Sequence, residues 1–598
     1  MTAAEATAGT RRVRSNPRVA GGLALGALAL VGLVLPLVIA RHHGALGAAR
    51  GDDWSYLVTL FRWVDTGRLE FNNWVSMSLL GQLVLAAPIA VSRGHAIALV
   101  QAQTAVIGLV GLGALALLGR RLGLSWGAVT LAGVTIAISP LWLILSTTFM
   151  TDVPAFTIST IGLLLATVAL QARPIRTPLL IAGFAVAVYA VSIRQYAIVP
   201  VIAIVLAGAL GLRTDADRRH VVAFAVAVGI GAVATLAFLV WWYSVPDARA
   251  LSPSAPTGRD LRTAVIKGAG FLRLAGLGLL PIICWRGPVR VVRDALAASR
   301  PLAVVAILGT ALWQAATATR YLSSQFVGNY VIRDGALSIA VLPGTRPDLM
   351  PGPLWNLLVV LGSLGAIVLA LATVPVIARL AGRVRDRDLA GVDPVTGLLG
   401  LTVFGFATAY GLAMVTGVQV YDRYALPALA IAALLILRGA PTDGTRARAV
   451  GAGLALALLG VVGINAAIDS ASFDGGRWRL AQRVVDVGGW RPKQVNGGFE
   501  WVNYHRGRRG TVAARASIER LLPDGTVIRI APYCVNLRVR VPAPGPSAGS
   551  TGAPPIASIE YVAPLRDPVR IVALRSPRPC VAPRGSTPGL GGGPNPAP

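Results

Sequence analysis

The chain has 598 residues, of which 55% are hydrophobic and 14% charged, and the hydrophobic residues occur in long blocks. This pattern excludes a soluble globular protein and indicates a polytopic membrane protein. The net charge of +29 does not call for nucleic acid as a partner, because the arginines fall in short clusters between apolar blocks, as retention of basic loops in the cytoplasm predicts. Cys284, Cys534 and Cys580 are the only cysteines, too few for a metal–cysteine cluster or a disulfide-dense scaffold.

The first apolar block runs from Val19 to Ala40 and follows a basic stretch, residues 1–18. It is longer than the ~7–15-residue apolar core of a signal peptide. We therefore expect a retained membrane span with the N-terminus in the cytoplasm.

Twelve further segments have the ~17–25 apolar residues, or nearly so, that cross a bilayer. They lie near residues 97–118, 127–145, 153–170, 178–192, 196–212, 220–241, 268–284, 301–317, 353–378, 395–418, 425–437 and 449–468. Thirteen crossings predict a membrane domain over 19–468, with the C-terminus outside.

The arginines agree with this alternation of inside and outside loops. Each predicted inside loop carries a basic cluster, whereas the short outside connections after the fifth and eleventh spans hold only Arg194 and Arg423. The inside clusters are Arg120 and Arg121; Arg173 and Arg176; Arg213, Arg218 and Arg219; Arg286, Arg290, Arg293 and Arg300; Arg383, Arg385 and Arg387; and Arg438, Arg446 and Arg448.

The character of the chain changes after Asp469. The segments TVIRIAPYCVNLRVRV and VRIVAL alternate polar and apolar residues as strands do. The predicted fold class is thus an all-α polytopic membrane protein with a small extracytoplasmic C-terminal domain that contains β-strands, over 469–583. A Pro/Gly-rich tail, 584–598, is predicted to be disordered. Cys534 and Cys580 would meet an oxidising compartment and are expected to form a disulfide.

Unusual polar residues gather on the predicted outer side of the membrane. Asp52 and Asp53 lie in the first outer loop, residues 41–96, and Asp152 lies in the second. Arg194 to Tyr196 occupy the third, and the sixth contains QVYDRYALP, with Asp422, Arg423 and Tyr424. Because charge near the hydrocarbon persists where it faces a polar cavity or a substrate, these groups suggest one shared outer cavity.

Simpler explanations exist for each group. Trp54, Leu57, Val58, Phe61 and Val64 form one stripe of a predicted amphipathic helix along the outer interface, and Asp52 or Asp53 could simply cap it. Asp152, two residues before a proline, could likewise be a helix cap.

The YDRY group could anchor the membrane interface, with Tyr421 and Tyr424 in the aromatic belt and Asp422 paired with Arg423. His42 and His43 are expected to be solvated, because no other ligand residue stands at a metal-binding spacing from them.

The first span, DDWSYLVTLFRWVDTGRLEF, TDVPAF in the second outer loop and DRYALPAL before a late span together resemble the GT-C superfamily of membrane glycosyltransferases. The similarity is to the branch of protein O-mannosyltransferases and lipid A aminoarabinose transferases. An acidic pair, a following tyrosine and a later TG turn characterise that branch, and Asp52, Asp53, Tyr56, Thr66 and Gly67 match them. The resemblance covers roughly residues 19 to 470.

The resemblance implies transfer of a sugar from a polyprenyl-phosphate carrier to a glycan, lipid or protein acceptor on the outer face of the cytoplasmic membrane. It implies Asp52 as general base, with Asp53 beside it, and Arg423 facing the carrier phosphate. We expect Tyr56, Asp152, Arg194, Tyr196, Asp422 and Tyr424 to bind substrate.

Transfer of a sugar from a phosphate carrier to a hydroxyl requires the same kinds of group. A base must take the acceptor proton, and positive charge must meet the leaving phosphate, which Arg423 or Arg194 could supply. A divalent metal could assist the leaving group, yet no ligand cluster in the sequence requires one, and no cofactor is implied.

Two other classes of function remain open. A transporter or flippase of lipid-linked saccharides would also need outer charge, although the related repeats with broken helices that mark many transporters are not visible. A non-catalytic assembly protein of the cell envelope could use the outer domain, where NGGFEWVNYHRG, Asn496 to Gly507, could bind a saccharide or pack on the membrane body. The sequence does not name the sugar, the carrier or the acceptor.

Overall fold

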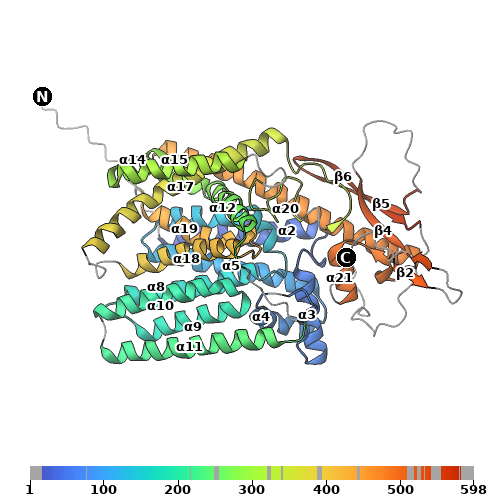
Figure 1. Cartoon of the computed structure of the whole chain (residues 1–598), viewed down its shortest axis with the longest axis horizontal. Coiled ribbons are helices and arrows are strands. Elements are labelled where there is room, and N and C mark those ends of the chain that lie inside the picture. Colours follow the sequence, from blue (N-terminus) through green and yellow to red (C-terminus); the bar gives the residue numbers. More distant parts are fainter. Residues whose placement is uncertain are drawn as a thin grey trace.

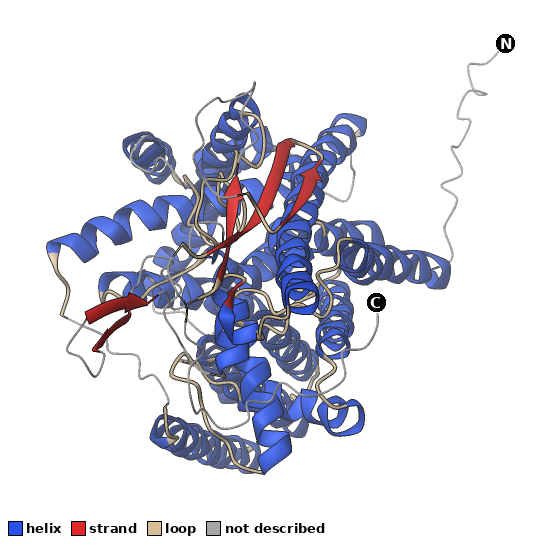
Figure 2. Cartoon of the chain, turned by 90° about the vertical axis from the view of Figure 1, so that its right-hand side faces the viewer, coloured by secondary structure: helices blue, strands red, loops and turns tan. Residues whose placement is uncertain are grey.

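The computed structural model describes residues 17–75, 77–215, 217–247, 255–318, 325–337, 341–386, 393–440, 445–507, 518–521, 527–530, 533–540, 554–577 and 580. Helices form an elongated body, and strands gather at one end of it (Figure 1). Figure 2 looks onto that end, where the strands lie in front of the helices. The predicted disordered tail and most of the basic N-terminus lie outside the described residues.

The elements follow in chain order. The first group comprises α1 (Pro17–Ala29), η1 (Leu30–Val34), α2 (Leu35–His42), α3 (Asp53–Thr66), α4 (Leu80–Arg93), α5 (Ile97–Arg121), α6 (Trp126–Ala137), α7 (Pro140–Leu145) and α8 (Asp152–Gln171). The second comprises α9 (Thr177–Ile193), η2 (Gln195–Ala197), α10 (Ile198–Asp215), α11 (Arg218–Ser244), α12 (Gly258–Gly278), α13 (Leu280–Arg286), α14 (Pro288–Ala298) and α15 (Arg300–Ala318).

The third group completes the helical body and adds the sheet. It comprises α17 (Gly352–Arg385), α18 (Pro394–Val415), η3 (Asp422–Tyr424), α19 (Ala425–Arg438), α20 (Arg446–Gly488), η4 (Pro492–Gln494), β1 (Val495–Asn496), α21 (Phe499–Arg506), β2 (Ile518–Leu521), β3 (Val527–Ile530), β4 (Val535–Arg540), β5 (Ala557–Ala563) and β6 (Arg566–Arg575).

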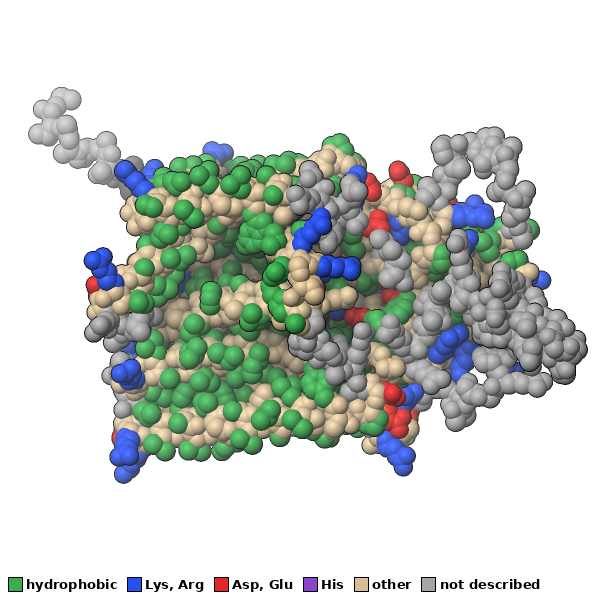
Figure 3. Space-filling model, in the orientation of Figure 1, with side chains coloured by type: hydrophobic (Ala, Val, Ile, Leu, Met, Phe, Trp, Pro, Cys, Tyr) green, Lys and Arg blue, Asp and Glu red, His purple; other side chains and the backbone are tan. Residues whose placement is uncertain are grey.

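Nine of the described helices are long and apolar enough to cross a membrane, and α12 with α13 makes a tenth candidate that is bent by 61°. The fold class, a polytopic helical membrane protein with a small C-terminal sheet, is confirmed. The predicted count of thirteen spans and their orientation stay predictions. Figure 3 shows a broad apolar face on the helical body, with basic side chains along the edge away from the sheet.

Two local differences from the predicted spans have clear causes. The segment 127–145 is not one helix, because α6 ends at Ala137 and α7 begins at Pro140. The Ser139 hydroxyl caps α7 by accepting a hydrogen bond from the Trp142 N–H. Within residues 41–96, predicted as the first outer loop, a helix that was not predicted, α4, packs against α3 and α9.

Small residues bring the helices of the body close together. An added Cβ at Gly162 in α8 would lie 2.9 Å from the Gly183 carbonyl oxygen in α9. At Gly276 in α12 it would lie 2.2 Å from the Gly362 oxygen in α17. Helices in membranes gain stability from such backbone approach, because packing rather than the hydrophobic effect holds them together.

The C-terminal sheet has the order β1-β4-β6-β5, in which β1 and β4 are parallel and the remaining pairs antiparallel. The strand predictions in TVIRIAPYCVNLRVRV and VRIVAL are confirmed by β3, β4 and β6. Alternate side chains of β4 face a core that also includes Phe473 and Leu480 of α20. Because α20 runs unbroken through Asp469, the sheet rests on the end of a membrane helix.

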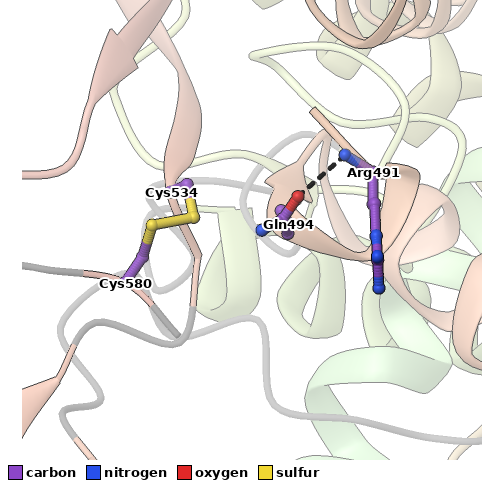
Figure 4. Close-up of a disulfide and its surroundings, with 4 residues drawn as sticks. All are labelled: Arg491, Gln494, Cys534 and Cys580. Atoms are coloured by element: carbon purple, nitrogen blue, oxygen red, sulfur yellow. Dashed lines mark hydrogen bonds between the residues drawn. A yellow bond between two sulfur atoms is a disulfide. The ribbon is translucent and has the colours of Figure 1, made fainter. Parts of the chain in front are cut away.

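A disulfide joins Cys534, at the start of β4, to Cys580, as the sequence predicted (Figure 4). Nearby, the Arg491 N–H donates a hydrogen bond to the Gln494 side chain in the turn that leads into β1. Cys284 is free. The covalent link ties the segment after β6 back to the sheet.

Candidate functional site

Four connections that are far apart in the sequence meet at the sheet end of the helical body. Asp52 immediately precedes α3, and Asp152 is the first residue of α8. Arg194 stands between α9 and η2, and Arg423 lies in η3, before α19. The structure therefore brings together four of the residues that the sequence singled out as catalytic or substrate-binding.

Ion pairs connect these four side chains. Arg423 Nη2 donates to Asp52 Oδ2 at 2.8 Å, and Arg423 Nε lies 3.9 Å from Asp152 Oδ2. The same Asp152 oxygen is 3.3 Å from Arg194 Nη1, which also donates to the Thr151 hydroxyl at 2.6 Å. Asp52 keeps 23% of its side chain exposed, whereas that of Asp152 is fully buried. Asp52 is thus more exposed to solvent than Asp152.

The cluster contains buried polar atoms without a hydrogen-bond partner. These are Nε and Nη1 of Arg423 and Oδ1 of Asp152. Leaving such groups unpaired is costly in a protein interior. The guanidinium has donors to spare for an anion, and a planar fork suits phosphate.

Aromatic rings alternate with the cations. Arg194 lies 4.6 Å from the centre of the Tyr424 ring, and Arg423 lies 5.2 Å from that of Tyr421. Lys267 of α12 lies 5.9 Å from the centre of the Tyr421 ring. Tyr196 packs against Tyr424, with ring centres 6.0 Å apart. Such rings hold cations in place without neutralising them.

Lys267 borders a hollow beside the cluster. Its ammonium donates to the Val420 carbonyl at 3.3 Å, and the small hollow is also lined by Arg273, Gln325 and Phe326. Lys267 is therefore a third cation near the cluster, because it and Arg423 both lie within about 6 Å of the centre of the Tyr421 ring.

Asp53 is placed differently from Asp52. Its side chain is fully buried and accepts hydrogen bonds from the N–H groups of Arg50 and Phe149 and from the Gln101 amide. Burial raises the pKa of Asp53 to about 7, although these hydrogen bonds oppose the rise. The two neighbours thus point to different places, and only Asp52 contacts Arg423.

The capping explanations are wrong for these carboxylates. Asp52 occupies the N-cap position of α3, but its side chain makes no capping hydrogen bond there. It accepts instead from Trp74 Nε1 at 3.0 Å and from Arg423. At α8 the N-cap residue is Thr151, again without a side-chain cap, and Asp152 is turned to the arginines.

The predicted amphipathic helix is present as α3, but its first turns do not lie on an interface. Every residue from Asp53 to Phe61 is buried, including polar Ser55 and Thr59. The helix is packed inside the protein because α4 and α21 cover it. Tyr56, expected to bind substrate, is buried, and its hydroxyl donates to the Met77 sulfur.

The interface-anchor explanation of YDRY is also wrong. Asp422 is buried and does not pair with the Arg423 side chain. Its Oδ2 accepts from the N–H groups of Tyr330 and Val331, at 2.8 and 2.7 Å, and its Oδ1 from the Arg423 N–H. Asp422 therefore holds the loop that carries Arg423.

Sequence reasoning missed Trp74, Gln101, Lys267 and Tyr330, whose roles depend on long-range contacts. It expected His42 and His43 to be solvated, and His42 is exposed, whereas His43 Nδ1 lies 2.8 Å from the Ser472 hydroxyl. Among the described residues, no group of three or more His, Cys, Asp or Glu side chains could hold a metal ion.

No protein-family model matches the chain, and no curated protein matches it. Among solved structures, apo ArnT from Cupriavidus metallidurans is 14% identical, with a TM-score of 0.37 and 93% of this chain and 98% of that chain covered. The oligosaccharyltransferase of Archaeoglobus fulgidus is 15% identical, with a TM-score of 0.41. The match covers 80% of this chain and 59% of the archaeal chain.

Two further structures of these enzymes contain lipid phosphates. Archaeal oligosaccharyltransferase AglB, in complex with an inhibitory peptide and a dolichol-phosphate, is 14% identical, with a TM-score of 0.42 over 82% of this chain and 64% of that chain. ArnT bound to undecaprenyl phosphate is 12% identical, with a TM-score of 0.39 over 92% and 97%. All four structures are less than 25% identical to this chain, and their TM-scores lie below 0.5.

Proposed function

We propose that the chain is a membrane glycosyltransferase that moves a sugar from a polyprenyl-phosphate carrier to an acceptor hydroxyl on the outer face of the cytoplasmic membrane. The observation that carries this proposal is the pairing of a partly exposed carboxylate, Asp52, with a buried guanidinium, Arg423, that still has two unpaired nitrogens. A base for the acceptor and a cation for the leaving phosphate thus stand side by side.

The roles follow from this arrangement. An Asp52 oxygen takes the proton of the acceptor hydroxyl as the acceptor oxygen bonds to the anomeric carbon. The bond between the sugar and the phosphate oxygen breaks, and its electron pair stays on the carrier phosphate. Arg423 offers Nε and Nη1 to that charge, and Asp152, which is itself paired with Arg194, lies 3.9 Å from the guanidinium and helps to orient it.

The surroundings suit an oily carrier. Lys267 adds a further positive charge next to Tyr421, and the apolar face of the helical body can hold a prenyl chain in the membrane (Figure 3). The phosphate would then reach the cations from the bilayer side while the acceptor approaches the exposed edge of Asp52.

A transfer assay tests the proposal. Purified protein in proteoliposomes is given radiolabelled polyprenyl-phosphate sugars, with membrane extract as a source of glycan, lipid and protein acceptors. Transfer predicts that label leaves the carrier and joins an acceptor. A transporter would move label across the bilayer with the sugar still joined to its carrier, and that result would overturn the proposal.

A further inference from the structure

The C-terminal domain reaches into the first outer loop through α21. This helix lies against α3, the helix that begins at Asp53, although the two are more than 400 residues apart in the sequence (Figure 1). The segment Asn496 to Gly507 therefore packs on the membrane body, one of the two roles that the sequence left open for it.

A direct hydrogen bond joins α21 to the backbone beside Asp52. The Gly51 N–H donates to Glu500 Oε1 at 3.0 Å, and Glu500 is 1% exposed. Gly51 has a φ of +60°, a left-handed conformation that a side chain would strain. The turn that directs Asp52 toward Arg423 is thus fixed by a carboxylate of the C-terminal domain.

Buried charges hold that carboxylate in turn. Glu500 Oε2 lies 2.9 Å from Arg477 Nη2, and Arg477 pairs with Asp474 at 3.1 Å. Asp474 then pairs with Arg50 at 3.0 Å. Because Arg50 precedes Gly51, the chain of charges returns to the loop and anchors two successive residues of it.

A second path runs through aromatic rings. The Phe499 ring lies 5.1 Å from that of Trp74 and 6.0 Å from that of Trp54, measured between centres. Trp74 Nε1 donates to Asp52 Oδ1. Phe499 and Glu500 are neighbours in α21, so one short helix acts on both the backbone and the side chain at the carboxylate.

We propose that Glu500 is a positioning residue for sugar transfer: through its hydrogen bond to Gly51, the C-terminal domain sets the geometry of Asp52. This inference rests on the proposed function of Asp52. Misplacing a catalytic group by about 1 Å can reduce a rate by up to ~100-fold. Helix α21 can therefore affect the rate of transfer through the position of Asp52, without contacting the reacting atoms.

The test compares Glu500→Ala with Glu500→Gln in the full-length protein. The glutamine oxygen can still accept from Gly51, whereas alanine cannot. In Glu500→Ala we expect amide hydrogen exchange over residues 47–55 to rise roughly tenfold. We also expect kcat for transfer to fall ~10–100-fold with KM for the labelled carrier within about twofold. Glu500→Gln should restore both quantities to within about threefold of wild type.

Tyr561→Phe serves as a matched control, since Tyr561 lies in the same domain and donates to buried Asp469 rather than to a residue of 47–55. It should leave exchange over 47–55 unchanged. If Glu500→Ala does not fold, Phe499→Leu tests the aromatic path and should also lower kcat rather than raise KM.

Several outcomes overturn the inference. Unchanged exchange over 47–55 in Glu500→Ala would show that Glu500 does not hold the loop. Faster exchange with wild-type kcat would show that the loop needs no anchor for transfer. A Gln variant as poor as Ala would assign the effect to the Arg477 ion pair. If the wild type transfers no label at all, the proposed function fails, while the exchange data still decide whether α21 anchors the loop.

Discussion

Two buried clusters of arginine and aspartate lie at the sheet end of the helical body. They differ in how many of their buried polar atoms have a hydrogen-bond partner. One is centred on Asp469 of α20, which is paired with Arg346 and with Arg566 of β6. The other is centred on Asp152 and Arg423. Both Asp469 oxygens accept hydrogen bonds, one of them also from Tyr561, whereas Asp152 Oδ1 has no partner.

The arginines differ in the same way. Arg346 and Arg566 each use both terminal nitrogens, with only Nε unpaired. Arg423 uses only Nη2. Charge buried for structure is satisfied within the protein, because unpaired buried charge lowers stability. A cluster that keeps donors unused beside a partly exposed carboxylate is better explained by a ligand that supplies the missing partners.

The largest expected effect is on Asp52. Asp52→Asn keeps the size of the side chain and an oxygen for Trp74, but the amide cannot take a proton from the acceptor. We expect transfer to fall by ~10²–10⁴-fold with expression and membrane insertion unchanged. The rate is measured as label moved from polyprenyl-phosphate sugar to acceptor.

Asp65→Asn is a matched control in the same helix, because Asp65 pairs with His95 at the surface. It should transfer as wild type does. Asp53→Asn should be less harmful than Asp52→Asn, since Asp53 is buried and lies outside the cluster. If Asp52→Asn and Asp53→Asn both stay within about threefold of wild type, Asp52 is not the base.

The comparison predicts the opposite behaviour for Asp469. Asp469→Asn leaves Arg346 and Arg566 buried without their carboxylate, which should cost about 3–5 kcal/mol of stability. Thermal unfolding in detergent measures the loss. Tyr561→Phe should cost only about 1 kcal/mol, because a single hydrogen bond is removed. A stable Asp469→Asn protein with abolished transfer would place Asp469 in the site and break the distinction.

Arg423→Lys sharpens the comparison at the site itself. Lysine keeps the charge but not the planar fork, so we expect transfer to fall roughly tenfold, the loss of one or two hydrogen bonds to phosphate. Arg333→Lys provides the control, because Arg333 pairs with Asp348 in a partly exposed ion pair. Full activity of Arg423→Lys would mean that charge alone is recognised.

Much of the fold could be predicted from the sequence, because long apolar blocks have few alternatives in water. The break at Pro140 and the helix α4 could not. Proline permits either a kink or a new helix, and α4 lies in a loop whose packing against α3 and α9 is set by tertiary contacts. Local patterns carry no information about such contacts.

The site could be predicted in part for a similar reason. Asp52, Asp152, Arg194 and Arg423 stand out because charged residues are rare next to apolar spans. Glu500 does not, since a carboxylate in a polar outer domain is ordinary until the fold brings it to Gly51. The burial of Tyr56 was not predicted either, because its position beside the acidic pair does not show that α4 and α21 cover α3; its role in substrate binding stays a prediction.

The smallest expected effect concerns the pH dependence of stability and the buried carboxylate Asp53. Burial raises the pKa of Asp53 from 3.8 to about 7, so the folded protein binds this proton more tightly than the unfolded chain. Its contribution to stability is complete below about pH 4 and is lost as the pH rises toward 7. Between pH 6 and 7 the loss should be about 1 kcal/mol. Glu500, whose pKa burial also raises to about 7, adds a similar slope. Asp53→Asn should therefore remove this loss of about 1 kcal/mol between pH 6 and 7, measured as the free energy of unfolding at the two pH values. An unchanged slope in Asp53→Asn would mean that Asp53 keeps its charge in the folded protein, held by Arg50, Phe149 and Gln101.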